Sequence, residues 1–194
     1  MTTEAPPRAD EAPSQRRVER RWTPVFAVLG VIALVTAGPG VLVGDDQGGE
    51  VVRVGAVAVT PRPGWELVDR ATEGDTDQVV LQRGSALMLV VAATDAGPSV
   101  TDLARGYADV VLRDRLAQLV IVDEVTTVST ASGRTGVRFA YVGVEQGGGA
   151  VEGVVTTVIG PTGEGVVFDA FSPEGGLPAA IDDVRVMVDG AVIG

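Results

Sequence analysis

The stretch "TPRPGWELVD", residues 60–69, places one of the two tryptophans of this 194-residue chain directly after a Pro–Arg–Pro–Gly turn. Trp65 stands there at the start of a predicted strand, in a chain of which only 4% of the residues are aromatic. A buried tryptophan removes about 150–250 Å² from solvent, a large share of such a core. We expect the indole to cover the end of a hydrophobic layer between a sheet and a helix; a stacking platform for a ligand is the alternative.

Patterns typical of strands follow this corner along the chain. Apolar alternation or continuous apolar runs predict strands at 54–60, 65–71, 77–83, 86–93, 120–130, 135–144, 150–159 and 165–171. Val137, Phe139 and Tyr141 share one face, as a sheet with one buried face requires. Turn signals separate the runs: "PRPG" (61–64), Gly84–Ser85, "SGR" (132–134), "QGGG" (146–149) and "PTGEG" (161–165).

Two stretches have helical periodicity instead. In 98–119 the apolar residues near one stripe are Leu103, Tyr107, Val110, Val111 and Leu119, and Ser99 with Asp102 forms a capping box. In 175–193 the stripe consists of Leu177, Ala180, Ile181, Val184, Met187, Val188 and Ala191, with Asp182, Asp183, Arg185 and Asp189 opposite. Each helix has to bury its stripe against the sheet. The sequence therefore predicts an α+β fold, a largely antiparallel sheet packed against two amphipathic helices.

The N-terminal part has a different organisation. Residues 1–21 are polar and Pro-rich, which predicts a disordered tail. Residues 22–44 carry no charge and are long enough to cross a hydrocarbon core of about 30 Å. Arginines crowd the preceding flank, so the positive-inside rule keeps the tail cytoplasmic and places the rest outside. We expect a transmembrane helix at 22–44, a linker at 45–53 and an extracytoplasmic domain at 54–194; a cleaved signal peptide or a buried core helix is the alternative for 22–44.

Composition excludes several mechanisms. The chain has neither Cys nor His, and all of its 15 basic residues are Arg. A Cys nucleophile, a Ser–His–Asp triad, a Ser–Lys dyad and a Cys/His zinc site cannot be built from it. Residues 45–194 hold ten Arg against twenty-two acidic residues, so they would repel nucleic acid.

The remaining candidates for chemistry are weak. The pairs Asp123–Glu124 and Asp182–Asp183 cannot form a shared-proton dyad, because adjacent side chains diverge on a strand or helix. "EGDTD" (73–77) alternates acidic residues as a calcium loop does but lacks the remainder of the EF-hand pattern. The Gly-rich stretches at 146–153 and 161–165 lead into strands, which predicts hairpin turns rather than phosphate loops. The hydroxyl cluster at 126–132 has no base beside it.

The order of these features resembles the PsbP-like fold and, within it, the LpqN-type cell-envelope proteins of actinobacteria, over roughly residues 54–193. The resemblance is carried by "VTPRPGWEL" (59–67), a middle helix that holds Tyr107, "TASGRTGVRFAYVG" (130–143) leading into "VEGVVTTVIGPTGEGVVFDAFSP" (151–173), and a final amphipathic helix ending in "VMVDGAVI". Lipoprotein members of this group use a lipidated Cys as their anchor, and this chain has none.

The resemblance implies a non-catalytic binding or accessory module of the cell envelope, held in the cell membrane by residues 22–44 and acting with a protein partner. We expect no catalytic, metal or cofactor-binding residues, no cofactor and no nucleic-acid partner. The alternatives are a carrier of a small apolar ligand, held between sheet and helices, and a carboxylate-dependent hydrolase. A carrier needs a cavity of about 300 Å³ or more, whereas an adaptor needs a filled core and an exposed apolar patch.

Overall fold

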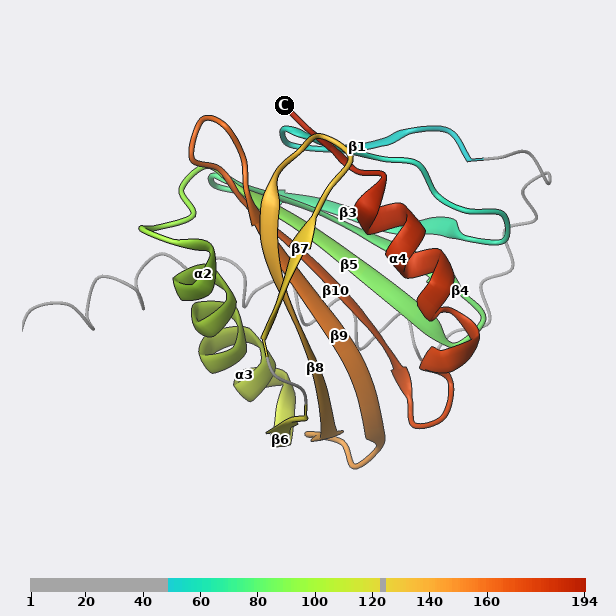
Figure 1. Ribbon diagram of the computed structural model, residues 1–194. Coiled ribbons are helices and arrows are strands. Elements are labelled where there is room, and N and C mark those ends of the chain that lie inside the picture. Colours follow the sequence, from blue (N-terminus) through green and yellow to red (C-terminus); the bar gives the residue numbers. More distant parts are fainter. Residues whose placement is uncertain (1–48, 123–124) are drawn as a thin grey trace, which may run out of the picture.

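The computed structural model describes residues 49–122 and 125–194. Their strands and helices form a layered α+β arrangement around one large sheet, in which α2 and α3 lie on one side and α4 lies on the other (Figure 1). The anchor, tail and most of the linker predicted for 1–48 lie outside the described residues, as does the pair Asp123–Glu124. Among the described residues, no helix combines the length and the apolar character needed to cross a membrane.

The large sheet is antiparallel throughout and follows the order β3-β4-β5-β10-β9-β8-β6, with β7 also paired to β8. Its strands are β3 (Glu66–Glu73), β4 (Thr76–Arg83), β5 (Ala86–Ala93), β6 (Leu116–Ile121), β7 (Thr126–Ser129), β8 (Thr135–Glu145), β9 (Ala150–Ile159) and β10 (Gly165–Pro173). The predicted antiparallel sheet is confirmed. The five turns also form where the sequence predicts them, and Gly64, Gly84 and Gly133 adopt the positive φ that tight turns require.

Two hydrophobic cores fill the two faces of this sheet. The central strand β5 contributes to both, because successive side chains of a strand point to opposite faces. Met88 and Val90 lie in the core on the side of α4, and Leu89 and Val91 lie in the core on the side of α2. The sheet is therefore buried on both faces at its centre, which explains the continuous apolar run of 86–93.

A second, three-stranded sheet covers part of the α4 side. It has the order β1-β2-β11 and consists of β1 (Val52–Val54), β2 (Val57–Val59) and β11 (Val192–Ile193). The single strand predicted at 54–60 is wrong, because Gly55, with φ +54°, turns the chain and splits the run into a hairpin. β1 begins within the stretch 45–53 that was expected to be a linker.

The middle helix is shorter than the predicted 98–119 and is interrupted. It consists of α2 (Val100–Tyr107), the π-helical turn η1 (Ala108–Leu112) and α3 (Arg113–Arg115). Ser99 caps it as predicted, its Oγ accepting a hydrogen bond from the Asp102 amide at 3.1 Å. Leu119 belongs to β6 rather than to the helical stripe, because the chain becomes extended at Leu116. Leu103, Tyr107 and Val111 are buried as predicted.

The strand predicted at 120–130 is two strands, β6 and β7, that pair with different parts of β8. Ile121 lies opposite Tyr141, and Thr126 lies opposite Arg138. Beyond β6, the Val122 amide still donates to the Ala140 carbonyl at 3.0 Å, and the regular pairing with β8 begins again at Thr126. β6 and β7 together therefore form one interrupted edge of the large sheet. Among the described residues, neither strand pairs with anything other than β8.

The C-terminal amphipathic helix is confirmed, with shorter bounds than 175–193. It consists of a short 3-10 turn, η2 (Leu177–Ala179), and α4 (Ile181–Asp189), followed by β11. The predicted stripe is buried apart from Ile181, which is half-buried at its margin. After the helix, Val192 and Ile193 of β11 pair with Ala58 and Val57 of β2, which joins opposite ends of the domain.

Candidate functional site

Trp65 lies in the core, as the sequence predicts. Only 5% of its surface is exposed, and it packs with the hydrophobic residues on the side of α4. Its Nε1–H donates a hydrogen bond to Oδ2 of Asp183 at 3.3 Å, and Arg62 and Arg83 form ion pairs with the same carboxylate. The sequence places Asp183 on the face opposite the apolar stripe, where we would expect it to be solvated, but its side chain is only 22% exposed in this cluster. The side chain of Asp182 is 92% exposed, as expected.

A polar cluster that sequence reasoning missed lies in the core on the other face of the sheet. Asp169 of β10 is fully buried, and its carboxylate accepts hydrogen bonds from the hydroxyls of Tyr107 and Tyr141, each at 2.9 Å. Nη1 of Arg115 is 3.0 Å from Oδ2 of Asp169, and Nη2 of Arg115 donates to the Tyr141 hydroxyl. The guanidinium also stacks over the Phe171 ring, 4.0 Å from its centre. A buried carboxylate needs this degree of pairing to be tolerated.

The π-helical turn η1 explains how one helical segment supplies two members of this cluster. Tyr107 and Arg115 are eight residues apart, which on a regular α-helix would separate their directions by about 80°. A π turn accommodates one additional residue, so the two side chains lie as residues seven apart do, within about 20°. Both therefore point toward Asp169 on the sheet below.

On the sheet, Gly153 makes room for the cluster. It lies directly opposite Tyr141 in the β8–β9 pairing, and a Cβ atom there would come within 2.3 Å of Cζ of the Tyr141 ring. The ring lies across this gap and reaches Asp169. The signal for the cluster is present in the sequence, because Asp169 interrupts the otherwise apolar strand "GVVFDAF" (165–171).

The electrostatics of the cluster hold both tyrosines in the neutral form. Burial is the main cause that raises the pKa of Tyr107 and of Tyr141 well above the ordinary value, and the negative charge of Asp169 acts in the same direction. Arg115 opposes both effects. Each tyrosine hydroxyl donates its proton in a hydrogen bond to the Asp169 carboxylate, and this bond has a structural role. The cluster joins α2–α3 to the sheet.

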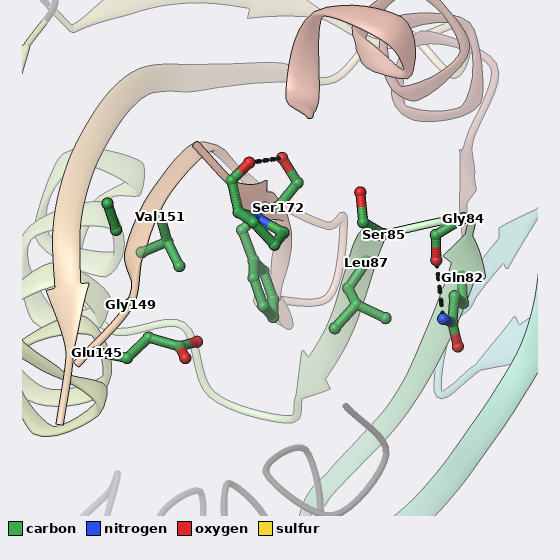
Figure 2. A pocket seen from close by; sticks show the side chains of 11 residues that line it. Gln82, Gly84, Ser85, Leu87, Glu145, Gly149, Val151 and Ser172 are labelled. Carbon is green, nitrogen blue, oxygen red and sulfur yellow. Dashed lines mark hydrogen bonds between the residues drawn. The ribbon is translucent and has the colours of Figure 1, made fainter. Parts of the chain in front are cut away.

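A cavity of about 340 Å³ opens beside this cluster, at one end of the large sheet. The β4–β5 turn, the β8–β9 turn and the end of β10 enclose it (Figure 2). Its apolar lining includes Leu87, Val151 and Phe171, whose ring also contacts Arg115. Its polar lining includes Gln82, Ser85, Glu145 and Ser172.

A second surface lies along the β6 edge. A groove of about 360 Å³ runs between α2–η1 and β6, and its apolar lining includes Ala108, Leu119, Ile121, Val125 and Phe139. Val120, Ile121, Val122 and Val125 are large apolar residues that are 43–57% exposed. We call these four residues the β6 patch. Ile121 and Val125 line the groove, whereas Val120 and Val122 alternate with Ile121 along the chain and face the other side of the sheet. Soluble domains seldom leave this much apolar surface along an unpaired sheet edge.

A third hollow, of about 540 Å³, lies between α4 and the strands β7, β8 and β9. Val154, Ile181 and Val184 give it an apolar part, and Arg138 and Arg185 line it as well. Both arginines already have acidic partners, Asp189 at 3.4 Å and Asp182 at 3.6 Å.

The other sequence candidates lie in turns and on strands. Residues 73–77 form the β3–β4 turn, where Asp77 accepts a hydrogen bond from Thr72 at 2.6 Å. The Gly-rich stretches at 146–153 and 161–165 form hairpin connections, as predicted. Thr126, in the hydroxyl cluster 126–132, bonds its hydroxyl to the Arg138 carbonyl at 3.4 Å. In the parts of the chain that the structure describes, no three His, Cys, Asp or Glu side chains are grouped to hold a metal ion.

The sequence matches no protein-family model and no curated protein. Its fold is similar to that of cyanobacterial PsbP (CyanoP) from Synechocystis sp. PCC 6803, with a TM-score of 0.57 and 12% identity, over 82% of this chain and 99% of that one. A lower similarity, with a TM-score of 0.49 and 10% identity, relates it to the Ran-binding protein Mog1p of Saccharomyces cerevisiae, over 77% and 96% of the two chains. The similarity to CyanoP shows the fold alone, and it confirms that the domain has a PsbP-like fold.

Proposed function

We propose that the chain is a membrane-anchored, extracytoplasmic and non-catalytic binding or accessory module of the cell envelope, of the LpqN type of actinobacteria. The topology rests on the sequence. Arginines at 16, 17, 20 and 21 precede the uncharged segment 22–44, and Asp45 and Asp46 follow it. This charge distribution favours a cytoplasmic N-terminus and an outer C-terminal domain.

The β6 patch is the observation that carries the binding role. Buried hydrophobic clusters lie on both faces of the sheet, and the apolar residues exposed at this edge belong to neither of them. Val120 is 57% exposed and Ile121 is 43% exposed, and Ile121 also lines the groove beside α2 and η1. A partner that covers this edge would remove apolar surface from water and satisfy the free backbone groups of β6.

The arrangement of the buried polar groups supports a non-catalytic role. Asp169 and both tyrosine hydroxyls are hydrogen-bonded to one another in the core. Burial and the charge of Asp169 raise the pKa values of the tyrosines, which disfavours their use as bases near neutral pH. With Cys, His and Lys missing from the sequence, no common nucleophile–base pair is available.

Photo-crosslinking in intact cells tests this proposal. A photoreactive amino acid at Ile121 of the full chain should give one discrete protein adduct, which Val125→Glu should abolish by placing a charge in the contact. The same amino acid at Asp182, on the exposed side of α4, is the control and should give no such adduct. An absence of adducts from Ile121, or the same products from both positions, would contradict a partner at the β6 patch.

A second candidate function is the carriage of a small apolar ligand between sheet and helix. The hollow under α4 favours it, because its volume of about 540 Å³ lies within the range of ligand sites and Ile181 and Val184 offer apolar contacts. Methyl NMR of Val184 during titration with a fatty-acid probe tests it: saturable shifts at Val184 would support carriage, and their absence would refute it.

A further inference from the structure

The cavity at the strand ends has a lining unlike that of the other two hollows. Three segments far apart in the sequence enclose it, and its volume of about 340 Å³ suits a small molecule. Leu87, Val151 and Phe171 belong to the core on the α2 side, so the apolar wall is held by the packing of the domain. Arg115 stacks on the Phe171 ring and is itself fixed by Asp169, which further restrains that ring.

Glu145 is the one charged side chain among the residues that line this cavity. It is half-buried, and within residues 49–122 and 125–194 its carboxylate makes no hydrogen bond or ion pair. Figure 2 shows this carboxylate directed toward the space between Val151 and Leu87. The positive charge of Arg115, which stacks on the lining residue Phe171, is already neutralised by Asp169 at 3.0 Å. The cavity thus combines an apolar wall with one available negative charge.

A second polar group faces the same cavity. Ser85, at the β4–β5 turn, lines it, and among the described residues its hydroxyl has no hydrogen-bond partner. The hydroxyl of Ser172, by contrast, is bonded to the Pro173 carbonyl at 2.9 Å. Glu145 can only accept hydrogen bonds when ionised, and Ser85 can also accept one. Both groups therefore favour a ligand with donors.

We propose that this cavity binds a small organic cation, in which an ammonium group faces Glu145 and an apolar body packs on Leu87, Val151 and Phe171. The ammonium would form a charge-assisted hydrogen bond with the Glu145 carboxylate. The excess of acidic residues, 26 against 15 Arg in the whole chain, would raise the local concentration of cations. An anion of the same shape would be repelled.

Two probes with the same phenethyl body and opposite charge test this site, phenethylamine and 3-phenylpropionate. Methyl NMR of the full chain in zwitterionic lipid nanodiscs would follow Leu87 and Val151 during each titration. We expect saturable shifts of these methyls with phenethylamine and none with 3-phenylpropionate. Glu145→Gln should weaken phenethylamine binding by roughly tenfold, the effect of losing one charged hydrogen bond.

Glu66→Gln is the matched control, because it removes the same charge from an exposed position on β3 outside the cavity. It should leave the phenethylamine affinity unchanged, and unchanged methyl spectra away from the cavity would show that both variants are folded. Equal binding of the two probes, no shifts at millimolar phenethylamine, or the same affinity in Glu145→Gln as in the parent would each overturn the proposal. The result is independent of the β6 patch.

Discussion

The indole Nε1–H of Trp65 donates a hydrogen bond to the carboxylate of Asp183, 3.3 Å away on α4. The bond connects the corner that opens the large sheet to the C-terminal helix, 118 residues later in the sequence. Around it the indole fills the end of the core, and Arg62 and Arg83 hold the carboxylate from the solvent side. Trp65 therefore combines a large apolar contact with one polar bond between distant parts of the chain.

Truncation of Trp65 should be costly for this reason. Trp65→Ala should lower the free energy of unfolding by about 3–5 kcal/mol, because it removes buried surface and leaves a cavity. Denaturant melts of the full chain would measure it. An unchanged free energy of unfolding would show that the indole is not part of the core.

Asp183 and its neighbour Asp182 provide a matched pair on one helix. Asp183→Ser should cost about 1 kcal/mol, because the indole N–H loses its acceptor and the two arginines lose their shared partner. Asp182→Ser should remain within about 0.5 kcal/mol of the parent, because its side chain is 92% exposed. Equal effects of the two substitutions in denaturant melts would argue against the Trp65–Asp183 bond.

The buried ion pair of Arg115 and Asp169 should be far more sensitive. Arg115→Met should lower the free energy of unfolding by about 3–5 kcal/mol, because Asp169 would be left as a buried charge without its cation. The double substitution Arg115→Met with Asp169→Leu should recover part of that loss, since it removes both charges. A double variant that is less stable by the sum of the two single effects would contradict direct pairing.

Tyr107 and Tyr141 are the only tyrosines of the chain, so tyrosinate absorbance reports on this cluster alone. Their pKa values are raised, mainly by burial, so folding favours the neutral phenols. The stability that results is complete below the unfolded pKa of about 10 and is lost as the pH rises above it. We expect tyrosinate to appear only together with loss of the folded circular dichroism signal. Ionisation near pH 10 in the folded protein would contradict the buried cluster.

Alanine substitutions at Gly153 and Gly147 test whether the Tyr141 ring needs the space that a glycine leaves at position 153. Gly153→Ala should destabilise the protein by about 1–3 kcal/mol, since the new methyl group overlaps the Tyr141 ring. Gly147→Ala, in the β8–β9 turn with open space around it, should be close to neutral. Thermal melts of both variants would compare them, and a neutral Gly153→Ala would show that the ring can lie elsewhere.

Local patterns predicted most of the large sheet. The predicted strands 86–93 and 150–159 coincide with β5 and β9. Turn signals on both sides of a long apolar run leave little choice for the residues at which the strand begins and ends. The run 54–60 was misread because Gly55 occupies the turn of a hairpin that looks continuous in sequence. The pairing of β11 with β2 could not be predicted, since it depends on contact between the two ends of the domain.

The candidate sites were less accessible to sequence reasoning. The charged residue Asp169 within an apolar strand was a usable signal for a buried pair, but its partners come from β8 and from a helix with an irregular turn. A regular helical period places Arg115 about 80° away from Tyr107, so the pattern does not bring them together. The cavity around Glu145 also needs two turns and the end of β10, which only the sheet order brings side by side.

Every part of the proposed envelope role depends on the location of the PsbP-like domain outside the cytoplasm. The most direct test is a reporter that is active only outside the cytoplasm, fused after Gly194 of the full chain and assayed in whole cells. We predict activity of this fusion, and loss of that activity when the uncharged segment 22–44 is deleted. An inactive fusion, combined with activity of a cytoplasm-only reporter at the same position, would contradict the proposed location and with it the envelope function.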